Sequence, residues 1–190
     1  MVGIGHFGIG LMSKRVAPNM PLGVLLICAY FIDIVFIVFM VAGLEHLPQP
    51  DIVTMSPWSH SLLMALVWSI LAGLIAMGLC RDYFTSLFIG LLVFSHWLVD
   101  FIAKPMTYIF PNDSGLLLFP GGSLVVGLGV MSSLIGVIVL EYGTLLTGIV
   151  IYIFTLKKLK ESKKKVHTET TDAQSSKLGN VSPIVSASKQ

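Results

Sequence analysis

The hydrophobic pattern divides most of the chain into long apolar runs separated by short polar segments. A helix needs about 20 apolar residues to cross a bilayer, and three runs reach that length: residues 22–44, 57–79 and 84–103. A fourth run, residues 124–156, is apolar except for Glu141. Residues 1–17 are apolar and glycine-rich but too short to span, so they predict a half-inserted or interfacial helix.

Turn-forming residues mark the boundaries between these runs. Ser56 and Pro57 predict a helix start, because serine caps helices and proline suits the first helical position. Prolines predict a loop over residues 47–59, and PNDSG and FPGG predict another over 104–123. Residues 124–156 contain no strong turn, so one crossing is expected there, with two short spans as the alternative. The prediction is an all-α, polytopic membrane helix bundle of about four transmembrane helices plus the N-terminal half-inserted helix.

The composition agrees with a membrane protein. The 190 residues are 55% hydrophobic and 12% charged, and the mean hydropathy is +0.87. Such values indicate an integral membrane protein with the lipid bilayer as its partner, and nothing in the sequence predicts nucleic-acid binding. Cys28 and Cys80 lack CxxC spacing, so we interpret them as packing residues.

The charges divide the chain into two parts. Residues 1–156 carry four basic against seven acidic residues, a net −3, whereas residues 157–190 carry eight against three, a net +5. We therefore predict a membrane helical domain, 1–156, and a basic, disordered cytoplasmic tail, 157–190. With alternating spans, Lys14, Arg15 and Arg81 share one membrane face, which the positive-inside rule makes cytoplasmic. These basic residues follow an apolar stretch, so no cleavable signal peptide is predicted.

Ionisable residues inside the apolar runs are the candidate functional residues, because they are costly in lipid. His96 and Asp100 are four residues apart, which places both on one helix face. At about 1.5 Å per helical residue, His6, Asp33 and His60 fall in the same middle and outer half of the bundle. Three imidazoles and two carboxylates suit zinc or a comparable divalent ion.

Other interpretations of these residues stay open. His96 and Asp100 could form a simple hydrogen-bonded pair, and His60 could be an interfacial or capping residue. Asp33 could pack helices or belong to a proton path. We expect Glu45 to be a helix-end charge at the lipid surface.

A catalytic metal site would also need a carboxylate that accepts a proton. The metal lowers the pKa of a water toward neutrality, and a nearby base takes the proton. The candidate catalytic residues are Asp33, as base or further ligand, and Glu141, as a partner of the site. Alternatively, Glu141 marks a kink in a long helix.

Several segments occur here in a recognisable order: GHFGIGLMSKRVAP, the Asp33 run ending in GLE, PWSHSLLMALVW, FSHWLVDF, and an FPGG…VGLG run that ends at Glu141. Together they resemble the membrane-bound metal-dependent hydrolases of bacteria, an inner-membrane group that includes a LexA-binding member. That group is distantly similar to zinc-dependent phospholipase C and to single-strand-specific zinc nucleases. The resemblance covers about residues 3–157, and PWSHSLLMALVW with SHWLVD is its specific part. It implies a bacterial inner (plasma) membrane protein with metal ligands at His6, Asp33, His60, His96 and Asp100.

Three functions compete at this point. The first is a membrane-embedded metal-dependent hydrolase of a phosphoester, with a phospholipid as one possible substrate. The second is a small proton-coupled transporter, although the chain has no internal repeat. The third is a non-enzymatic membrane protein whose polar residues only hold the bundle together.

Overall fold

The computed structural model describes residues 3–45, 57–104 and 127–179, with the side chains of Pro57 and of residues 172–179 excepted. Its described part is helical and contains no strand. Most of the two predicted loops, 47–59 and 104–123, and the capping residue Ser56 lie outside the described residues. The elements are α1 (Ile4–Ser13), α2 (Leu22–Ala29), α3 (Phe31–Val41), α4 (Pro57–His60), α5 (Leu62–Cys80), α6 (Tyr83–Ala103), η1 (Val130–Ser132), α7 (Leu134–Val137), η2 (Ile138–Gly143) and α8 (Thr144–Gly179).

Three helical runs are long and apolar enough to cross a membrane: α5, α6 and the run that starts at Leu134. The pair α2 and α3 makes a fourth crossing if it counts as one bent span. The prediction for residues 84–103 is confirmed by α6, and that for 124–156 by one uninterrupted helical run that begins ten residues later. Ser133 starts that run, because its hydroxyl accepts a hydrogen bond from Gly136 N–H at 3.0 Å.

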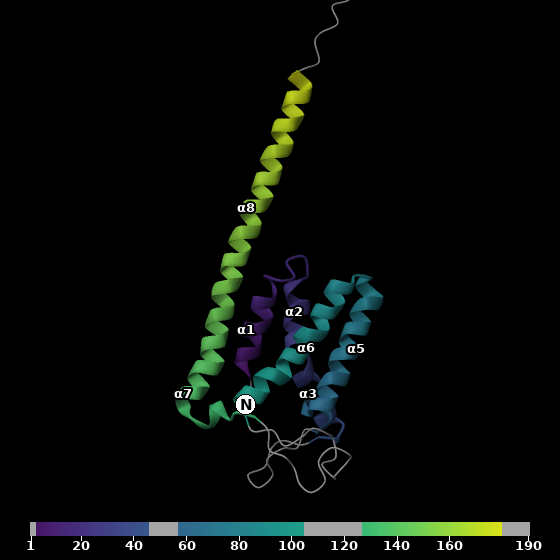
Figure 1. Ribbon diagram of the computed structural model, residues 1–190, viewed down its shortest axis with the longest axis vertical. Coiled ribbons are helices and arrows are strands. Elements are labelled where there is room, and N and C mark those ends of the chain that lie inside the picture. Colours follow the sequence, from purple (N-terminus) through teal and green to yellow (C-terminus); the bar gives the residue numbers. More distant parts are fainter. Residues whose placement is uncertain (1–2, 46–56, 105–126, 180–190) are drawn as a thin grey trace, which may run out of the picture. The chain divides into compact units, whose positions relative to one another are not determined.

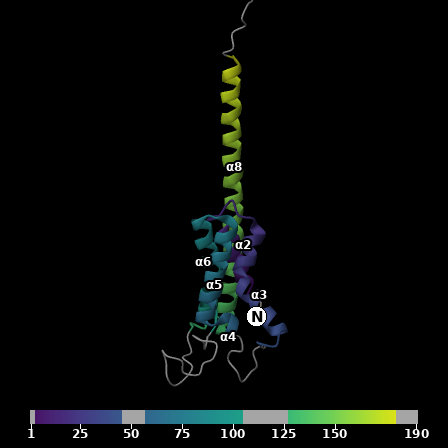
Figure 2. The same cartoon turned by 90° about the vertical axis from the view of Figure 1, so that its right-hand side faces the viewer.

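The predicted span over residues 22–44 is not a continuous helix. It breaks at Tyr30, and α2 and α3 meet there at a bend of 60°, which is visible in Figure 2. Tyr30 leaves the helical conformation (φ −99°, ψ 4°), and its hydroxyl donates to the Gly3 carbonyl at 2.5 Å. A break also releases carbonyls that a straight helix would satisfy internally, and the Ala29 carbonyl accepts a hydrogen bond from His96 instead.

The span predicted to start at Pro57 is also interrupted. Pro57 does begin a helix, but this helix ends at His60, and α5 begins at Leu62. Between them, Ser61 adopts an extended conformation (ψ 152°), and its hydroxyl accepts from Met64 N–H at 3.3 Å. Ser61 is therefore the cap of the long helix, and His60 lies on a separate single turn.

The chain forms two compact units, Met1–Tyr152 and Ile153–Gln190, which divide close to the predicted boundary at residue 156. Where the sequence predicts a disordered tail, α8 continues to Gly179. An existing helix propagates without the cost of a new nucleus, and the lysine-rich residues 157–165 have good helix propensity. Residues 180–190 lie outside the described part.

Helices α5 and α6 form a hairpin in the first unit (Figure 1). Small residues allow close approach: a Cβ on Gly90 would lie 3.0 Å from the Ser69 carbonyl oxygen, and one on Gly73 3.2 Å from that of Ser86. Arg81 closes the turn with a left-handed backbone (φ 53°). The Asp82 carboxylate then caps α6 by accepting from Thr85 N–H at 2.7 Å. Hydrogen bonds from the side chain and the backbone of Thr85 lower the pKa of Asp82.

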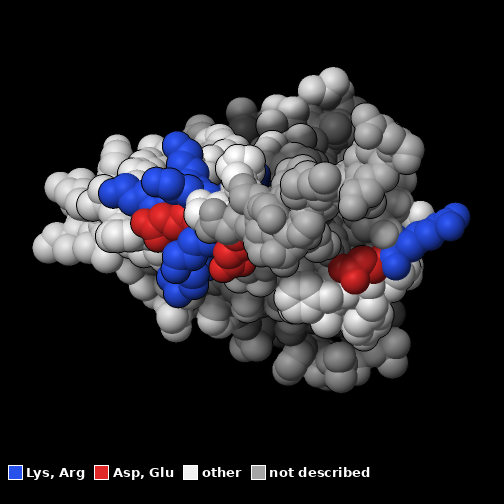
Figure 3. All heavy atoms as spheres, turned by 90° about the horizontal axis from the view of Figure 1, so that it is seen from above, with Lys and Arg blue, Asp and Glu red and all other residues white. Residues whose placement is uncertain are grey.

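The connection between α1 and α2 lies at the same end of this unit as the α5–α6 turn (Figure 1). These segments carry the basic residues Lys14, Arg15 and Arg81. In the view from above, charged side chains occur in a few places and most of the described surface is uncharged (Figure 3). The arrangement is compatible with a membrane protein whose basic connections lie on one face.

Helix α1 is held against the start of α8 by backbone contact. A Cβ on Gly8 would lie 2.3 Å from the Thr144 carbonyl oxygen, and one on Gly148 would lie 2.4 Å from that of Gly8. Only glycine fits at this crossing, and the contact sets the position of the first turns of α1.

Replacing Gly8 by alanine should therefore destabilise the protein. Alanine gains about 0.5–1 kcal/mol in helix propensity, but the overpacked crossing should cost about 1–3 kcal/mol. Thermal unfolding in detergent, followed by circular dichroism, measures the difference. Gly78→Ala is the matched control, because nothing lies within 4 Å of a Cβ there; equal stability of the two variants would contradict the predicted crossing.

Candidate metal centre

The structure brings together all five residues that the sequence identifies as candidate ligands. They come from four helices: α1 supplies His6, α3 supplies Asp33, α4 supplies His60, and α6 supplies both His96 and Asp100. The three histidines and Asp100 are buried. The Asp33 side chain is 30% exposed, which makes it the most open member.

Nitrogen and oxygen atoms of these side chains lie close to one another. His60 Nε2 lies 3.3 Å from Asp33 Oδ1 and 3.5 Å from Asp100 Oδ2. His96 Nε2 lies 3.5 Å from Asp33 Oδ1 and 4.0 Å from Asp100 Oδ2. His6 Nε2 lies 3.5 Å from Asp100 Oδ1.

These separations fit metal ligands better than hydrogen-bonded pairs. Hydrogen bonds between nitrogen and oxygen usually measure about 2.7–3.2 Å, so His96 and Asp100 are not the simple pair that the sequence left open. Zinc ligands at about 2.0–2.1 Å in a tetrahedron lie about 3.3–3.4 Å from one another. Three of the four contacts that His60 and His96 make with the carboxylates, at 3.3–3.5 Å, are close to that edge length.

His96 is held in the tautomer that a metal ligand requires. Its Nδ1 lies 2.9 Å from the Ala29 carbonyl oxygen, and a carbonyl only accepts, so Nδ1 carries the proton. Its Nε2 therefore presents a lone pair to the cluster. Metal-binding histidines commonly have such a partner on the outer nitrogen.

His60 is held in the same way by a carboxylate–hydroxyl chain. Glu45 accepts from both the backbone N–H and the hydroxyl of Ser59, each at 2.8 Å. The Ser59 hydroxyl has one hydrogen, which it gives to Glu45, so it accepts from His60 Nδ1 at 2.6 Å. The expectation of Glu45 as a charge at the lipid surface is wrong: it is 1% exposed and supports His60.

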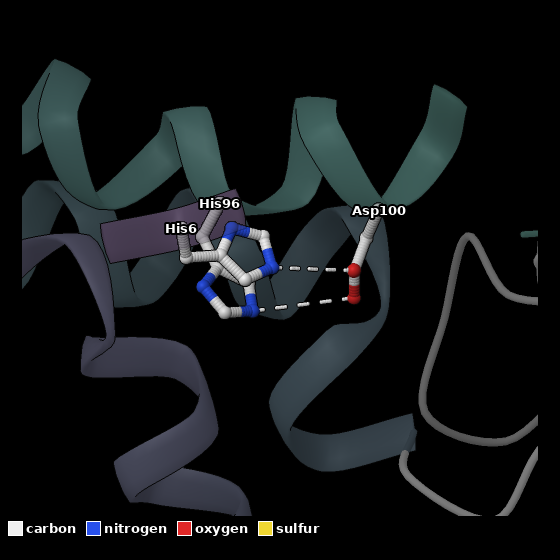
Figure 4. Close-up of side chains that lie close together, drawn as sticks. All are labelled: His6, His96 and Asp100. Carbon is white, nitrogen blue, oxygen red and sulfur yellow. Dashed lines mark ion pairs between the residues drawn. The ribbon is translucent and has the colours of Figure 1, made fainter. Parts of the chain in front are cut away.

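His6 reaches the cluster from a different direction. Its ring stacks on that of His96, with centroids 3.8 Å apart and planes 13° apart. Both rings direct nitrogens at the Asp100 carboxylate (Figure 4). A Cβ on Gly3 would lie 2.5 Å from the His6 ring, so glycine makes room for the imidazole.

Glu141 serves the helix that carries His6. It is buried in the π-helical turn η2, and its Oε2 accepts from Gly5 N–H at 2.8 Å. Gly5 lies in the first turn of α1, where backbone N–H groups need an external acceptor. Glu141 is not among the donors that the described residues place around a common ion, so we interpret it as a residue that positions His6.

A cavity of about 290 Å³ adjoins the cluster. His6, Asp33 and Asp100 line it together with Lys104 and Glu141, and the remaining wall is largely apolar. Lys104 Nζ contacts Asp100 Oδ2 at 2.7 Å. The sequence analysis did not identify Lys104, although its position one turn after Asp100 was a usable signal.

The donors fit a divalent metal ion. They form two overlapping groups, His6–His96–Asp100 and Asp33–His60–His96, and within each group the ligand atoms lie within 4.8 Å of one another. Both groups share His96, whose Nε2 is buried without a hydrogen-bond partner. Because one imidazole nitrogen binds one ion, the arrangement fits a single ion better than two.

No family model, curated protein or solved structure matches this chain. The family resemblance of the sequence motifs therefore stays a prediction.

Glu45→Gln should weaken metal binding without removing a ligand. The amide can donate to Ser59, and this removes the preference for a proton on His60 Nδ1. Loss of such an outer partner typically lowers metal affinity about 10–100-fold. Competition between the purified protein and a chromophoric chelator for Zn²⁺ measures this change.

Asp82→Asn is the control, because Asp82 is an exposed capping residue at the α5–α6 turn. Equal zinc affinity in Glu45→Gln and the unaltered protein would contradict the role given to Glu45.

Proposed function

We propose that this protein is a membrane-embedded, metal-dependent hydrolase that cleaves a phosphoester with an activated water. The observation that carries the proposal is the set of buried His and Asp donors at metal-ligand spacing, with two imidazoles held in the ligating tautomer. A proton relay or a packing contact needs neither that spacing nor those tautomers.

The ion would be held by His6, His60, His96 and Asp100, with Asp33 beside them. Nitrogen and carboxylate oxygen donors without a thiolate favour zinc, and manganese is the nearest alternative. When bound, the ion supplies a Lewis acid that lowers the pKa of a water toward neutrality.

The chain's own residues complete the reaction. Asp33 is the most exposed of the five side chains and lines the cavity, so it is our candidate for the base that takes a proton from water. The water oxygen then bonds to phosphorus as the ester P–O bond breaks. Asp33 returns the proton to the departing oxygen, which leaves as an alcohol.

The surroundings of the cavity favour an amphiphilic substrate. Its wall combines Lys104 with apolar residues such as Val99, Met131 and Leu140. A phosphoester that carries an apolar group, as a phospholipid does, matches both features.

Lys14, Arg15 and Arg81 favour a cytoplasmic position for the α1–α2 and α5–α6 connections. The cluster lies toward the opposite ends of α1 and α6, nearer the outer face of a bacterial inner membrane.

Metal analysis tests the proposal. The purified protein should contain about one equivalent of zinc or manganese, because the donor set suits a single ion. A double variant, His96→Ala with Asp100→Ala, should lose it together with any hydrolysis of phosphoester substrates. His167→Ala, an exposed histidine of α8, should keep both.

A protein that binds no metal after growth with added zinc would overturn the hydrolase proposal. The cluster would then be better explained as a proton path. Metal binding without hydrolysis of any soluble or lipid phosphoester would leave a metal-binding membrane protein and would remove the enzymatic part.

A further inference from the structure

One oxygen of Asp100 lies near both a lysine and two histidines of the cluster. Lys104 Nζ contacts Asp100 Oδ2 at 2.7 Å. The same oxygen belongs to the metal-binding arrangement, since it lies 3.5 Å from His60 Nε2 and 4.0 Å from His96 Nε2. A divalent ion held by that oxygen and an ammonium group on it would repel each other strongly, because both lie in a partly buried site.

The backbone of Lys104 is held in place, and its side chain is partly exposed. Lys104 N–H donates to the Asp100 carbonyl at 2.9 Å, and Leu128 N–H donates to the Phe101 carbonyl at 2.8 Å. A Cβ on Gly127 would lie 2.4 Å from the Lys104 carbonyl oxygen, so this segment packs tightly on the end of α6. The Lys104 side chain is 49% exposed, which leaves its ammonium group room to move along the cavity.

The charges that line the cavity bear on what the Lys104 ammonium group would bind if it moved. The described lining residues include three carboxylates, Asp33, Asp100 and Glu141, and one lysine, Lys104. With neutral imidazoles, the cavity is too negative to accept an anion. A divalent ion would offset two of these charges, and a displaced Lys104 would then face the cavity as a free cation.

We propose that Lys104 is a placeholder cation that exchanges partners. Without metal it neutralises Asp100, and when the ion takes Asp100 Oδ2 it moves to bind the phosphoryl group of the substrate. This inference rests on the proposed function, and it adds an order: metal binds first and the anion second. Lysine is well suited, because its ammonium group is a compact charge on a flexible stem.

The first part of the test is zinc affinity. Lys104→Met removes the competitor for Asp100, so the variant should bind Zn²⁺ more tightly than the unaltered protein, by about 5- to 100-fold for a coupled pair of sites. Chelator competition in detergent measures it. Lys160→Met, at an exposed lysine of α8, should leave zinc affinity unchanged.

The second part is anion binding to the zinc-loaded protein, measured by titration calorimetry. Two probes distinguish the sources of the phosphoryl group: inorganic phosphate, and dihexanoyl phosphatidic acid. Whichever probe binds to the unaltered protein should bind to Lys104→Met about tenfold or more weakly. The metal-free protein should bind neither probe. Lys104→Arg should restore anion binding, because it keeps the charge.

Tighter zinc binding together with weaker anion binding in Lys104→Met separates this role from a structural one. Weaker binding of both zinc and anion in Lys104→Met, or stronger zinc binding with unchanged anion binding, would overturn the inference while leaving the metal centre intact. If the unaltered protein binds zinc but neither probe in any state, the anion role is also wrong. If neither the unaltered protein nor Lys104→Met binds zinc, the metal centre itself fails and the inference fails with it.

Discussion

The constraint that shapes the first unit is the burial of ionisable side chains in a largely apolar bundle: His6, His60, His96, Asp100, Glu45 and Glu141. A buried ion costs several kcal/mol unless partners compensate it, and the bundle is built to supply them. His96 uses the Ala29 carbonyl, His60 uses Ser59 and Glu45, and Asp100 uses Lys104. The partners of His96 and His60 lie where regular helix is interrupted: Ala29 directly precedes the break at Tyr30, and Ser59 lies on the single turn α4.

The helix breaks therefore belong to the site, because they supply hydrogen-bond partners to its histidines. A straight helix over residues 22–41 would keep the Ala29 carbonyl within its own ladder and would leave His96 Nδ1 without an acceptor. A continuous helix from Pro57 would place Ser59 and His60 on different faces from those they now occupy. The π-helical turn at Glu141 similarly directs a carboxylate to the first turn of α1. Such turns often occur at functional sites.

The sequence misplaced Glu45 and did not single out Lys104. Both act through partners on another segment or at the end of a helix. Glu45 resembles a surface charge in the sequence because it ends an apolar run, yet it is among the least exposed residues of the described part. Ser59, which connects Glu45 to the cluster, directly precedes His60. Adjacency in sequence does not show which way its hydroxyl points.

The sequence by itself determined the helical class, the position of α6 and the five candidate ligands. These depend on the length and period of apolar runs and on the high cost of ionisable residues inside them, both of which are local properties. Only the tertiary structure decided where the helices break, which nitrogen of His60 and His96 carries its proton, and that Lys104 contacts a carboxylate oxygen of the cluster. Those features depend on distances between atoms from segments far apart in the chain, such as Ala29 and His96 or Gly5 and Glu141, and no local pattern encodes such distances.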